Sequence, residues 1–296
     1  MIKRSAVMVV ALASVVALVP VLGRQGPSRA APALIGKVRA SSQPIGGKLF
    51  VLIIGNDARA GNPNQSRADA LHLVGINTAT MKGGILNFPR DSYVQIPGSG
   101  SGRINEALFR GGPELTVKTV EAVTGIRIDY WVMTGFEGFK KIIKGIKGVP
   151  FKIGRDLYDP TGSGIRVKAR KKPYRLNANV ALAYVRTRHS FPRGDIDRST
   201  NQARFLLAML RKFRREVSMN PATMLRWVAL TREHARLNIS PEETFRLGVL
   251  TSQMKPRDMR SVTVPVTIGS VGAASVVFIQ PGAAAVYKRF RRNASL

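Results

Sequence analysis

The apolar run over residues 48–55 limits the possible folds more than any other stretch of this sequence. A run of strand length without alternating polar residues is typical of a strand buried on both faces of an α/β sheet. Two further strands are predicted over residues 71–77 and 84–88, and the connection through residues 78–82 is short enough for a hairpin. Strand and helix patterns then alternate to the C-terminus. We therefore expect one α/β domain over residues 47–296, without repeats or internal linkers.

The remaining elements follow from hydrophobic periodicity and from the positions of proline and glycine. We expect helices over residues 113–123, 136–146, 199–217, 221–235 and 241–254, with a last helix ending at Arg291. We expect strands over residues 128–133, 149–153, 259–265 and 274–279, and loops over 97–103 and 168–172. Residues 181–185 fit a strand or a short helix equally well.

Three predicted strand ends each carry an aspartate and an arginine, and Pro89 closes the third strand because proline lacks a ladder donor. Any one of these pairs is explained by an ordinary solvated turn. Together they indicate a site where carboxylates hold a hard cation such as Mg²⁺ and arginines grip phosphate oxygens. We therefore predict a metal-assisted site for an anionic, phosphate-containing substrate. The three pairs are Asp57 with Arg59, Arg67 with Asp69, and Arg90 with Asp91.

A second group of polar residues lies between an apolar segment and a strongly predicted helix. Arg186 and Arg188 alternate in a segment that we interpret as extended, so both side chains point the same way and form a fork suited to pyrophosphate. Arg198 and Gln202 share one face of the first helical turns, where free N–H groups attract anions. A basic surface segment is the alternative on charge alone, and the position of the group favours a site.

The charge of the chain biases its choice of partners. There are 47 Lys and Arg against 17 Asp and Glu, a net charge of +30, which favours nucleic acid, anionic membrane or acidic wall polymers. The absence of cysteine excludes disulfides, thiolate metal sites and a cysteine nucleophile. His72, His189 and His234 are scattered through the chain, so we expect no imidazole metal site.

The N-terminus indicates export. Lys3 and Arg4 precede 19 uncharged residues, 5–23, which as a helix at about 1.5 Å per residue span a hydrocarbon core of roughly 30 Å. We expect a single-pass signal-anchor over residues 1–24 and a flexible tether over 25–46, with the domain outside the cytoplasm. A cleaved signal peptide is the alternative, because residues 30–33 offer small side chains. Export counts against nucleic acid as the partner.

Several ordered motifs over about 250 residues resemble those of the LytR-CpsA-Psr family. Their spread along the chain makes the resemblance specific. The matching stretches are Gly55-Asn56-Asp57-Ala58-Arg59, Arg67-Ala68-Asp69, Pro89-Arg90-Asp91, Arg103-Ile104-Asn105-Glu106-Ala107 with Gly111-Gly112, Ala183-Tyr184-Val185-Arg186-Thr187-Arg188, and Asp195-Ile196-Asp197-Arg198 with Gln202.

The resemblance implies a three-layer α/β/α domain with a central mixed sheet on the cell-wall side of a bacterial cytoplasmic membrane. It further implies Mg²⁺-assisted transfer, with Mn²⁺ as the alternative ion, of an anionic glycan from a polyprenyl-pyrophosphate carrier to a peptidoglycan hydroxyl. Carried over residue by residue, it makes Asp69 and Asp91 the metal ligands and Asp57 the candidate base, with Arg90 and Asp91 also catalytic. The expected pyrophosphate contacts are Arg67, Arg90, Arg186, Arg188 and Arg198, with Gln202 as an orienting group.

The chain departs from the family pattern at three positions. Asp197 stands where glycine is usual, Asn201 where arginine is usual, and Asn56 where serine or aspartate is common. These departures bear on substrate choice or efficiency. Six apolar side chains on two predicted helices could line a lipid tunnel, although core packing explains most of them. They are Phe136, Phe139, Ile142, Leu206, Leu207 and Leu210.

Two other functions stay open at this point. A hydrolase that cleaves the lipid pyrophosphate to water needs the same phosphate site, and its turnover without peptidoglycan distinguishes it from a transferase. A non-catalytic wall-binding or lipid-binding module needs only the net charge, and salt-sensitive binding without Mg²⁺ dependence distinguishes it from both enzymes.

Overall fold

The computed structural model describes residues 33–37, 47–58, 66–237 and 241–296. The expected anchor over residues 1–24 and the expected partner Arg59 lie outside these ranges. Within the described ranges, no helix is long and apolar enough to cross a membrane.

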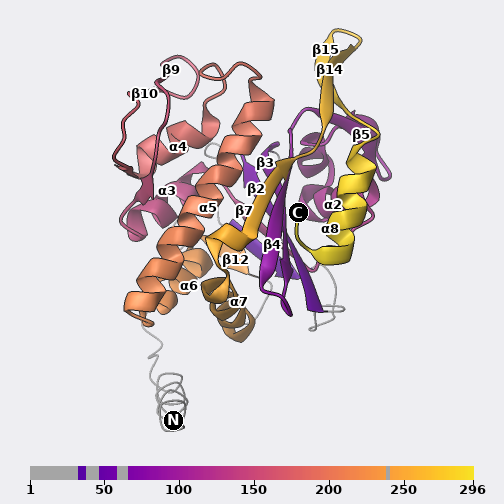
Figure 1. The fold of residues 1–296 in the computed structure, drawn as a ribbon. Coiled ribbons are helices and arrows are strands. Elements are labelled where there is room, and N and C mark those ends of the chain that lie inside the picture. Colours follow the sequence, from indigo (N-terminus) through magenta and orange to yellow (C-terminus); the bar gives the residue numbers. More distant parts are fainter. Residues whose placement is uncertain (1–32, 38–46, 59–65, 238–240) are drawn as a thin grey trace, which may run out of the picture.

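A seven-stranded mixed sheet forms the centre of the domain (Figure 1). Strands β2, β3 and β4 form an antiparallel meander, which confirms the predicted hairpin, while β7 and β13 add to it in parallel. In spatial order the strands are β12 (Ala235–Leu237), β1 (Ala33–Lys37), β7 (Tyr130–Thr134), β2 (Lys48–Asn56), β3 (Ala68–Asn77), β4 (Lys82–Phe88) and β13 (Met259–Thr263).

Strand β1 differs from the expected tether over residues 25–46. Its five residues pair antiparallel with β7 and parallel with β12, so this part of the stretch belongs to the central sheet. The short length of β1 and its Ala and Gly content hid it, because five residues show too little alternation to predict a strand.

Helices cover both faces of the sheet and make three layers (Figure 1). Helices α2 and α8 pack on one face, and α5, α6 and α7 cover the other. Helix α2 begins earlier than predicted and is kinked at Gly111 and Gly112, and Gly125 ends it in the left-handed conformation. The bounds are α2 (Glu106–Thr124), α5 (Asp195–Met219), α6 (Thr223–Glu233), α7 (Pro241–Gln253), the short η3 (Pro256–Asp258) and α8 (Ala283–Asn293).

A lobe of short elements packs beside α5. Residues 181–185 are helical, because they lie in α4, whose first turn is capped by the Asn177 side chain. The expected loop over residues 168–172 connects β10 and β11. The elements are α3 (Phe136–Gly145), β8 (Val149–Phe151), β9 (Leu157–Asp159), β10 (Ile165–Val167), β11 (Tyr174–Leu176) and α4 (Ala178–Arg186).

A four-stranded sheet at the other side corrects one prediction. Residues 100–103, expected in a loop, form β6 and pair with β5, while Gly98 and Gly100, both at φ +72°, make the connecting turn. The glycine-rich composition of residues 97–103 therefore reflects a hairpin turn. Strand β14 was not predicted. In spatial order the strands are β14 (Val266–Val271), β15 (Ala274–Ile279), β5 (Ser92–Ile96) and β6 (Gly100–Arg103).

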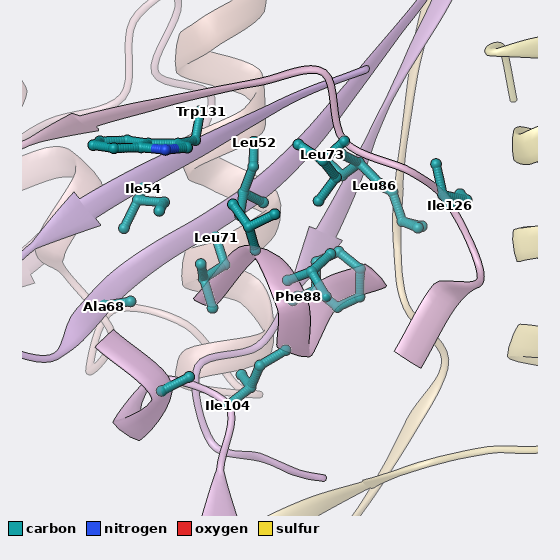
Figure 2. Close-up of a cluster of buried hydrophobic side chains, with 14 of the residues drawn as sticks. Leu52, Ile54, Ala68, Leu71, Leu73, Leu86, Phe88, Ile104, Ile126 and Trp131 are labelled. Atoms are coloured by element: carbon teal, nitrogen blue, oxygen red, sulfur yellow. The ribbon is translucent and has the colours of Figure 1, made fainter. Parts of the chain in front are cut away.

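The two faces of the central sheet are packed differently. Leu52, Ile54 and Leu71 are fully buried in the core between the sheet, α2 and α8 (Figure 2). The alternate residues of β2, including Val51 and Ile53, are only half-buried, although α5 lies over them. They line a cavity of about 330 Å³ between the sheet and helices α5 to α7. One face is close-packed and the other is hollow.

The close-packed face leaves no room for added atoms at Gly75. A Cβ there would lie 2.7 Å from Cζ of Phe290 and 2.8 Å from the carbonyl oxygen of Ala294. We expect Gly75→Ala to lower the free energy of unfolding by about 1–3 kcal/mol, because a crowded core must shift to admit it. Gly154→Ala is the control, since a Cβ at Gly154 meets nothing within 4 Å. Urea unfolding checks both, and equal midpoints for the two variants would contradict the packing described.

Candidate functional site

Three strand ends meet at one edge of the central sheet, as predicted. Strands β2 and β4 end beside the start of β3, which the register of Asn56 with Ala68 and of Leu71 with Phe88 shows. The first turns of α5 lie over this edge, where the Ser199 hydroxyl donates to the Phe88 carbonyl (3.4 Å). The elements therefore gather Asp69, Arg90, Asp91, Asp195 and Arg198 into one cluster, which we call the acid–arginine cluster.

Arg90 is the hub of the acid–arginine cluster. Its Nη1 lies 2.6 Å from Oδ1 of Asp69, and its Nε lies 3.3 Å from Oδ2 of Asp195 and 3.8 Å from Oδ1 of Asp91. Burial disfavours the charged guanidinium, but the three carboxylates outweigh this effect and raise the pKa of Arg90. Arg90 is therefore held in place and stays charged.

Arg198 forms the buried floor of the cluster, with a side chain 7% exposed. Its Nη2 lies 3.1 Å from Oδ1 of Asp195 and 3.9 Å from Oδ1 of Asp69. Burial lowers the pKa of Arg198, against the pull of these carboxylates. Gln202, one helical turn on, donates from Nε2 to the carbonyl oxygens of Val185 (2.9 Å) and Asp69 (3.3 Å). The shared helix face predicted for Arg198 and Gln202 is confirmed.

Asp91 and Asp195 are neighbours in the cluster, and each affects the pKa of the other. Burial and the hydrogen bond to Asp195 raise the pKa of Asp91 to about 6. Burial also acts to raise the pKa of Asp195, but Asp91, Arg198 and Arg90 outweigh it and lower that pKa. Arg103 Nε lies 3.6 Å from Oδ1 of Asp91. A cation bound beside these two carboxylates would offset the repulsion between them.

Asp195 and Arg103 received no role from the sequence, although both stood in the matched motifs. The spacing of Asp195 and Arg198, one turn apart at a helix start, is a signal that could have identified the first. No local pattern identifies Arg103, because its contact with Asp91 depends on the β5–β6 hairpin.

Arg186 and Arg188 do not form the extended fork that was predicted. Arg186 is the last residue of helix α4, and its guanidinium lies 4.7 Å from the centre of the Phe136 ring. Arg188 lies in the following loop, from which its charge helps to lower the pKa of Asp195. Both arginines approach the cluster, one from a helix end and one from a loop.

A buried carboxylate anchors that loop. Asp159 of β9 accepts hydrogen bonds from the Thr187 hydroxyl (2.9 Å) and the Gly162 amide (3.0 Å), and His189 Nδ1 lies 2.9 Å away. Burial acts to raise the pKa of Asp159, but these bonds outweigh it and hold the pKa well below its usual range. The loop that carries Arg188 is therefore tied to the lobe, which the sequence did not predict.

Asp57 and Arg67 contact each other rather than the acid–arginine cluster. The Arg67 amide donates to Oδ1 of Asp57 (2.8 Å), and the Asp57 amide donates to the Arg67 carbonyl (3.2 Å). These bonds hold the ends of the loop between β2 and β3 together. The roles expected for Asp57 as base and Arg67 as a phosphate contact stay predictions.

Two of the three family departures have local partners, and the third, Asn56, lines a smaller cavity beside the cluster. Asp197 pairs with Arg193, whose Nη2 lies 2.6 Å from Oδ1, so this extra carboxylate is already paired. Asn201 is buried and accepts from the Tyr184 hydroxyl (3.3 Å) and from Arg204 (3.4 Å).

A cavity of about 100 Å³ lies between the cluster and the hollow side of the sheet. Asp69, Arg198 and Gln202 lie at its polar end, and Ile53 and Leu206 line both this cavity and the larger one. The predicted tunnel residues divide between the two cavities, except for Ile142, which lines neither. Phe136 and Phe139 line the smaller cavity, Leu207 and Leu210 line the larger, and Leu206 lines both.

Comparison with known proteins shows the family. The model of the LytR_cpsA_psr family matches residues 29–291. The chain belongs to the LytR-CpsA-Psr family. The regulatory protein MsrR of Staphylococcus aureus (strain COL) is 32% identical over 223 residues, which cover 74% of this chain and 65% of MsrR.

Two comparisons within the LytR-CpsA-Psr family involve TagT. The polyisoprenyl-teichoic acid–peptidoglycan teichoic acid transferase TagT of Bacillus subtilis (strain 168) is 36% identical over 171 residues, which cover 55% of this chain and 52% of TagT. A solved structure of TagT bound to LI-WTA has a TM-score of 0.70 at 25% identity and covers 92% of this chain and 99% of that chain. The fold and the order of motifs are those of this family.

The raised pKa of Asp91 predicts a pH-dependent stability. Because the pKa of Asp91 in the folded state, about 6, exceeds the ordinary value of 3.8, the folded state binds this proton more tightly than the unfolded state. The stability of the fold therefore falls as pH rises from about 4 to 6. Asp91→Asn removes this penalty. In metal-free buffer at pH 7 we expect the free energy of unfolding of the variant to exceed that of the wild type by about 1–3 kcal/mol.

Denaturant unfolding at pH 4 and pH 7 measures this difference. The increase in the free energy of unfolding of Asp91→Asn over the wild type should be small at pH 4 and should reach its full size at pH 7. Asp156→Asn, which changes an exposed carboxylate paired with Lys168, should give no gain at either pH. An Asp91→Asn variant that is less stable than wild type at pH 7 would show that the folded state does not disfavour the ionised form of Asp91.

Proposed function

We propose that this chain transfers a glycopolymer, as a phosphodiester, from a polyprenyl-pyrophosphate carrier to a peptidoglycan hydroxyl. The observation that carries the proposal is that the cavity beside the acid–arginine cluster and the larger apolar cavity adjoin, since Ile53 and Leu206 line both. A polyprenyl-pyrophosphate carrier needs a charged site for its pyrophosphate and an adjacent apolar site for its prenyl chain. The similarity to TagT, a teichoic acid transferase, supports the same assignment.

The chain's own residues account for binding and charge neutralisation. Arg90 and Arg198 are fixed by carboxylates and have N–H groups suited to phosphate oxygens, and Arg186 and Arg188 reach the cluster from α4 and its loop. In the proposed reaction the acceptor oxygen forms a bond to the phosphorus that carries the glycan. The bond from that phosphorus to the bridging oxygen breaks, and polyprenyl phosphate leaves. The acceptor hydroxyl loses its proton to a base, for which Asp57 is the predicted candidate. Phosphoryl transfer depends mainly on such positioning and charge stabilisation.

The donor set fits Mg²⁺. Asp91 and Asp195 face each other, and Oδ1 of Asp195 accepts no hydrogen bond from the described residues beyond its ion pair with Arg198. In the described part of the chain, no group of three or more Asp, Glu, His or Cys side chains suits a metal. Mg²⁺ commonly takes one or two carboxylates and completes its shell with water and substrate phosphate. Bound there, the ion would neutralise charge on the phosphates.

Asp69, the other predicted ligand, is engaged by Arg90 in this structure. We propose Asp91 and Asp195 as the pair that holds the ion, with Mn²⁺ as the alternative ion, and the ligand role of Asp69 stays a prediction. We also propose that residues 1–24 anchor the chain in the cytoplasmic membrane and that the domain acts on the cell-wall side. The lipid carrier would then enter the cavities from the membrane.

The test is transfer by the full chain in detergent, with lipid-linked donor, peptidoglycan and Mg²⁺. We expect Arg90→Ala and Asp91→Ala to lower the transfer rate by on the order of 100-fold or more, because each removes a fixed charge at the reacting phosphates. Arg193→Gln is the control, because this exposed arginine of the loop before α5 pairs with Asp197 and the variant should keep nearly full activity.

Unchanged transfer by both cluster variants would contradict the proposal. An incubation without peptidoglycan distinguishes transfer from hydrolysis. Rapid release of polyprenyl phosphate without acceptor, at the rate seen with acceptor, would show that the chain is a hydrolase. Wild-type rates that do not respond to chelation and re-addition of Mg²⁺ would remove the metal from the proposal.

A further inference from the structure

The lobe over residues 149–177, here called the basic lobe, carries an unbalanced charge. It contains eight Lys and Arg against two Asp, and all eight basic residues are exposed. One of the two acids, Asp159, is buried and engaged by the loop after α4. The basic residues are Lys152, Arg155, Arg166, Lys168, Arg170, Lys171, Lys172 and Arg175.

The positive charges of the basic lobe are mostly free of acidic partners within the described part of the chain. Only Lys168 makes an ion pair, with the exposed Asp156 at 2.9 Å. Three arginines instead stack on aromatic rings, which restrains their guanidinium groups. Arg170 also donates to the carbonyl oxygens of Lys172 and Pro173, whereas the N–H groups of Arg155 and Arg166 make no hydrogen bond to the described residues and can meet an anion. The stacked pairs are Arg155 over Phe191 (5.4 Å), Arg166 over Tyr158 (5.6 Å) and Arg170 over Tyr174 (3.4 Å).

The basic lobe is attached directly to the loop that carries Arg188. The Thr187 hydroxyl donates to Asp159, and the Tyr158 amide donates to the Ser190 hydroxyl (3.1 Å). The ring that stacks under Arg155 belongs to Phe191 of the same loop. The lobe therefore begins where the proposed pyrophosphate contacts end.

The segment on the opposite flank of the site has no charged side chain of its own, although Arg103 donates to its Ser275 carbonyl. The β14–β15 hairpin protrudes on the other side of the first turns of α5, away from β9 and β10 (Figure 1). Thr200 of α5 and Thr263 before the hairpin are joined through their hydroxyls (2.8 Å). Residues 261–281 contain no Lys, Arg, Asp or Glu, and Ile268 and Phe278 are exposed there. In a chain of net charge +30, the two flanks of one site thus differ sharply.

We propose that the basic lobe binds the anionic chain of the donor glycopolymer. This inference rests on the proposed function, because the polymer must begin at the pyrophosphate. The lipid end would occupy the apolar cavities, so the glycan leaves on the outward side, between a basic flank and an uncharged one. Repeating negative charges complement the exposed cations and the stacked guanidinium groups of the basic lobe.

The test compares two lipid-pyrophosphate donors with the full chain: a disaccharide, and the same disaccharide extended with poly(glycerol phosphate). The lobe variant Arg166→Gln/Lys171→Gln/Lys172→Gln should raise KM for the long donor by on the order of tenfold, because three charges facing a polyanion are lost. Its KM for the short donor and its kcat for both should stay unchanged. Raising the salt concentration should reduce the difference between wild type and variant.

The matched control removes three exposed charges from α8: Lys288→Gln/Arg289→Gln/Arg292→Gln. It should behave like wild type with both donors. Equal KM increases in the two triple variants, or equal losses with both donors in the lobe variant, would overturn the proposal. Loss of binding to phosphatidylglycerol vesicles with unchanged transfer of both donors would assign the lobe to the membrane instead.

A failure of the proposed function gives a different result. If the wild type transfers neither donor, equilibrium binding of free poly(glycerol phosphate) decides the question. Weaker binding by the lobe variant than by the α8 variant supports an anion-binding lobe on a non-transferring protein. Equal binding by both variants overturns it.

Discussion

The structure depends on an asymmetry of packing across its central sheet. On one face, Leu52, Ile54 and Leu71 are sealed against α2 and α8, and this close-packed layer gives the sheet its rigidity. On the other face, apolar side chains line a cavity of about 330 Å³ under α5 to α7. A hollow apolar face loses the contacts that a packed core gains, so a ligand that fills it would stabilise the protein. Burial on the close-packed face offsets the packing that is lost on the hollow face.

The acid–arginine cluster lies beside these cavities and buries charged groups, which is costly unless they are paired. Arg198 is nearly buried, and Arg90 lies among three carboxylates, so each charge taken out of water has a partner. The ionised form of Asp91 is disfavoured in the cluster, because burial and the neighbouring Asp195 raise its pKa to about 6. Arginines held by carboxylates keep their orientation before an anion arrives, which lowers the cost of ordering them on binding.

Much of this arrangement could be predicted from the sequence, because it depends on local patterns. The strand meander followed from apolar runs, and Pro89 showed where Arg90 and Asp91 leave the sheet. The failures involve residues whose environment is set by distant segments. Arg186 ends a helix whose period a short apolar segment could not show, Arg103 reaches Asp91 through a hairpin, and β1 joins the sheet by pairing with β7 and β12. Asp159, buried under the loop after α4, had no sequence signal at all.

The most direct test of the central claim is an experimental structure of the protein with polyprenyl pyrophosphate bound. The pyrophosphate should contact Arg90 and Arg198, and the prenyl chain should pass Ile53 and Leu206 into the cavity between the sheet and α5 to α7. A prenyl chain bound on the outer surface, with the cavities between the sheet and helices unchanged, would contradict the claim that the hollow face of the sheet holds the lipid.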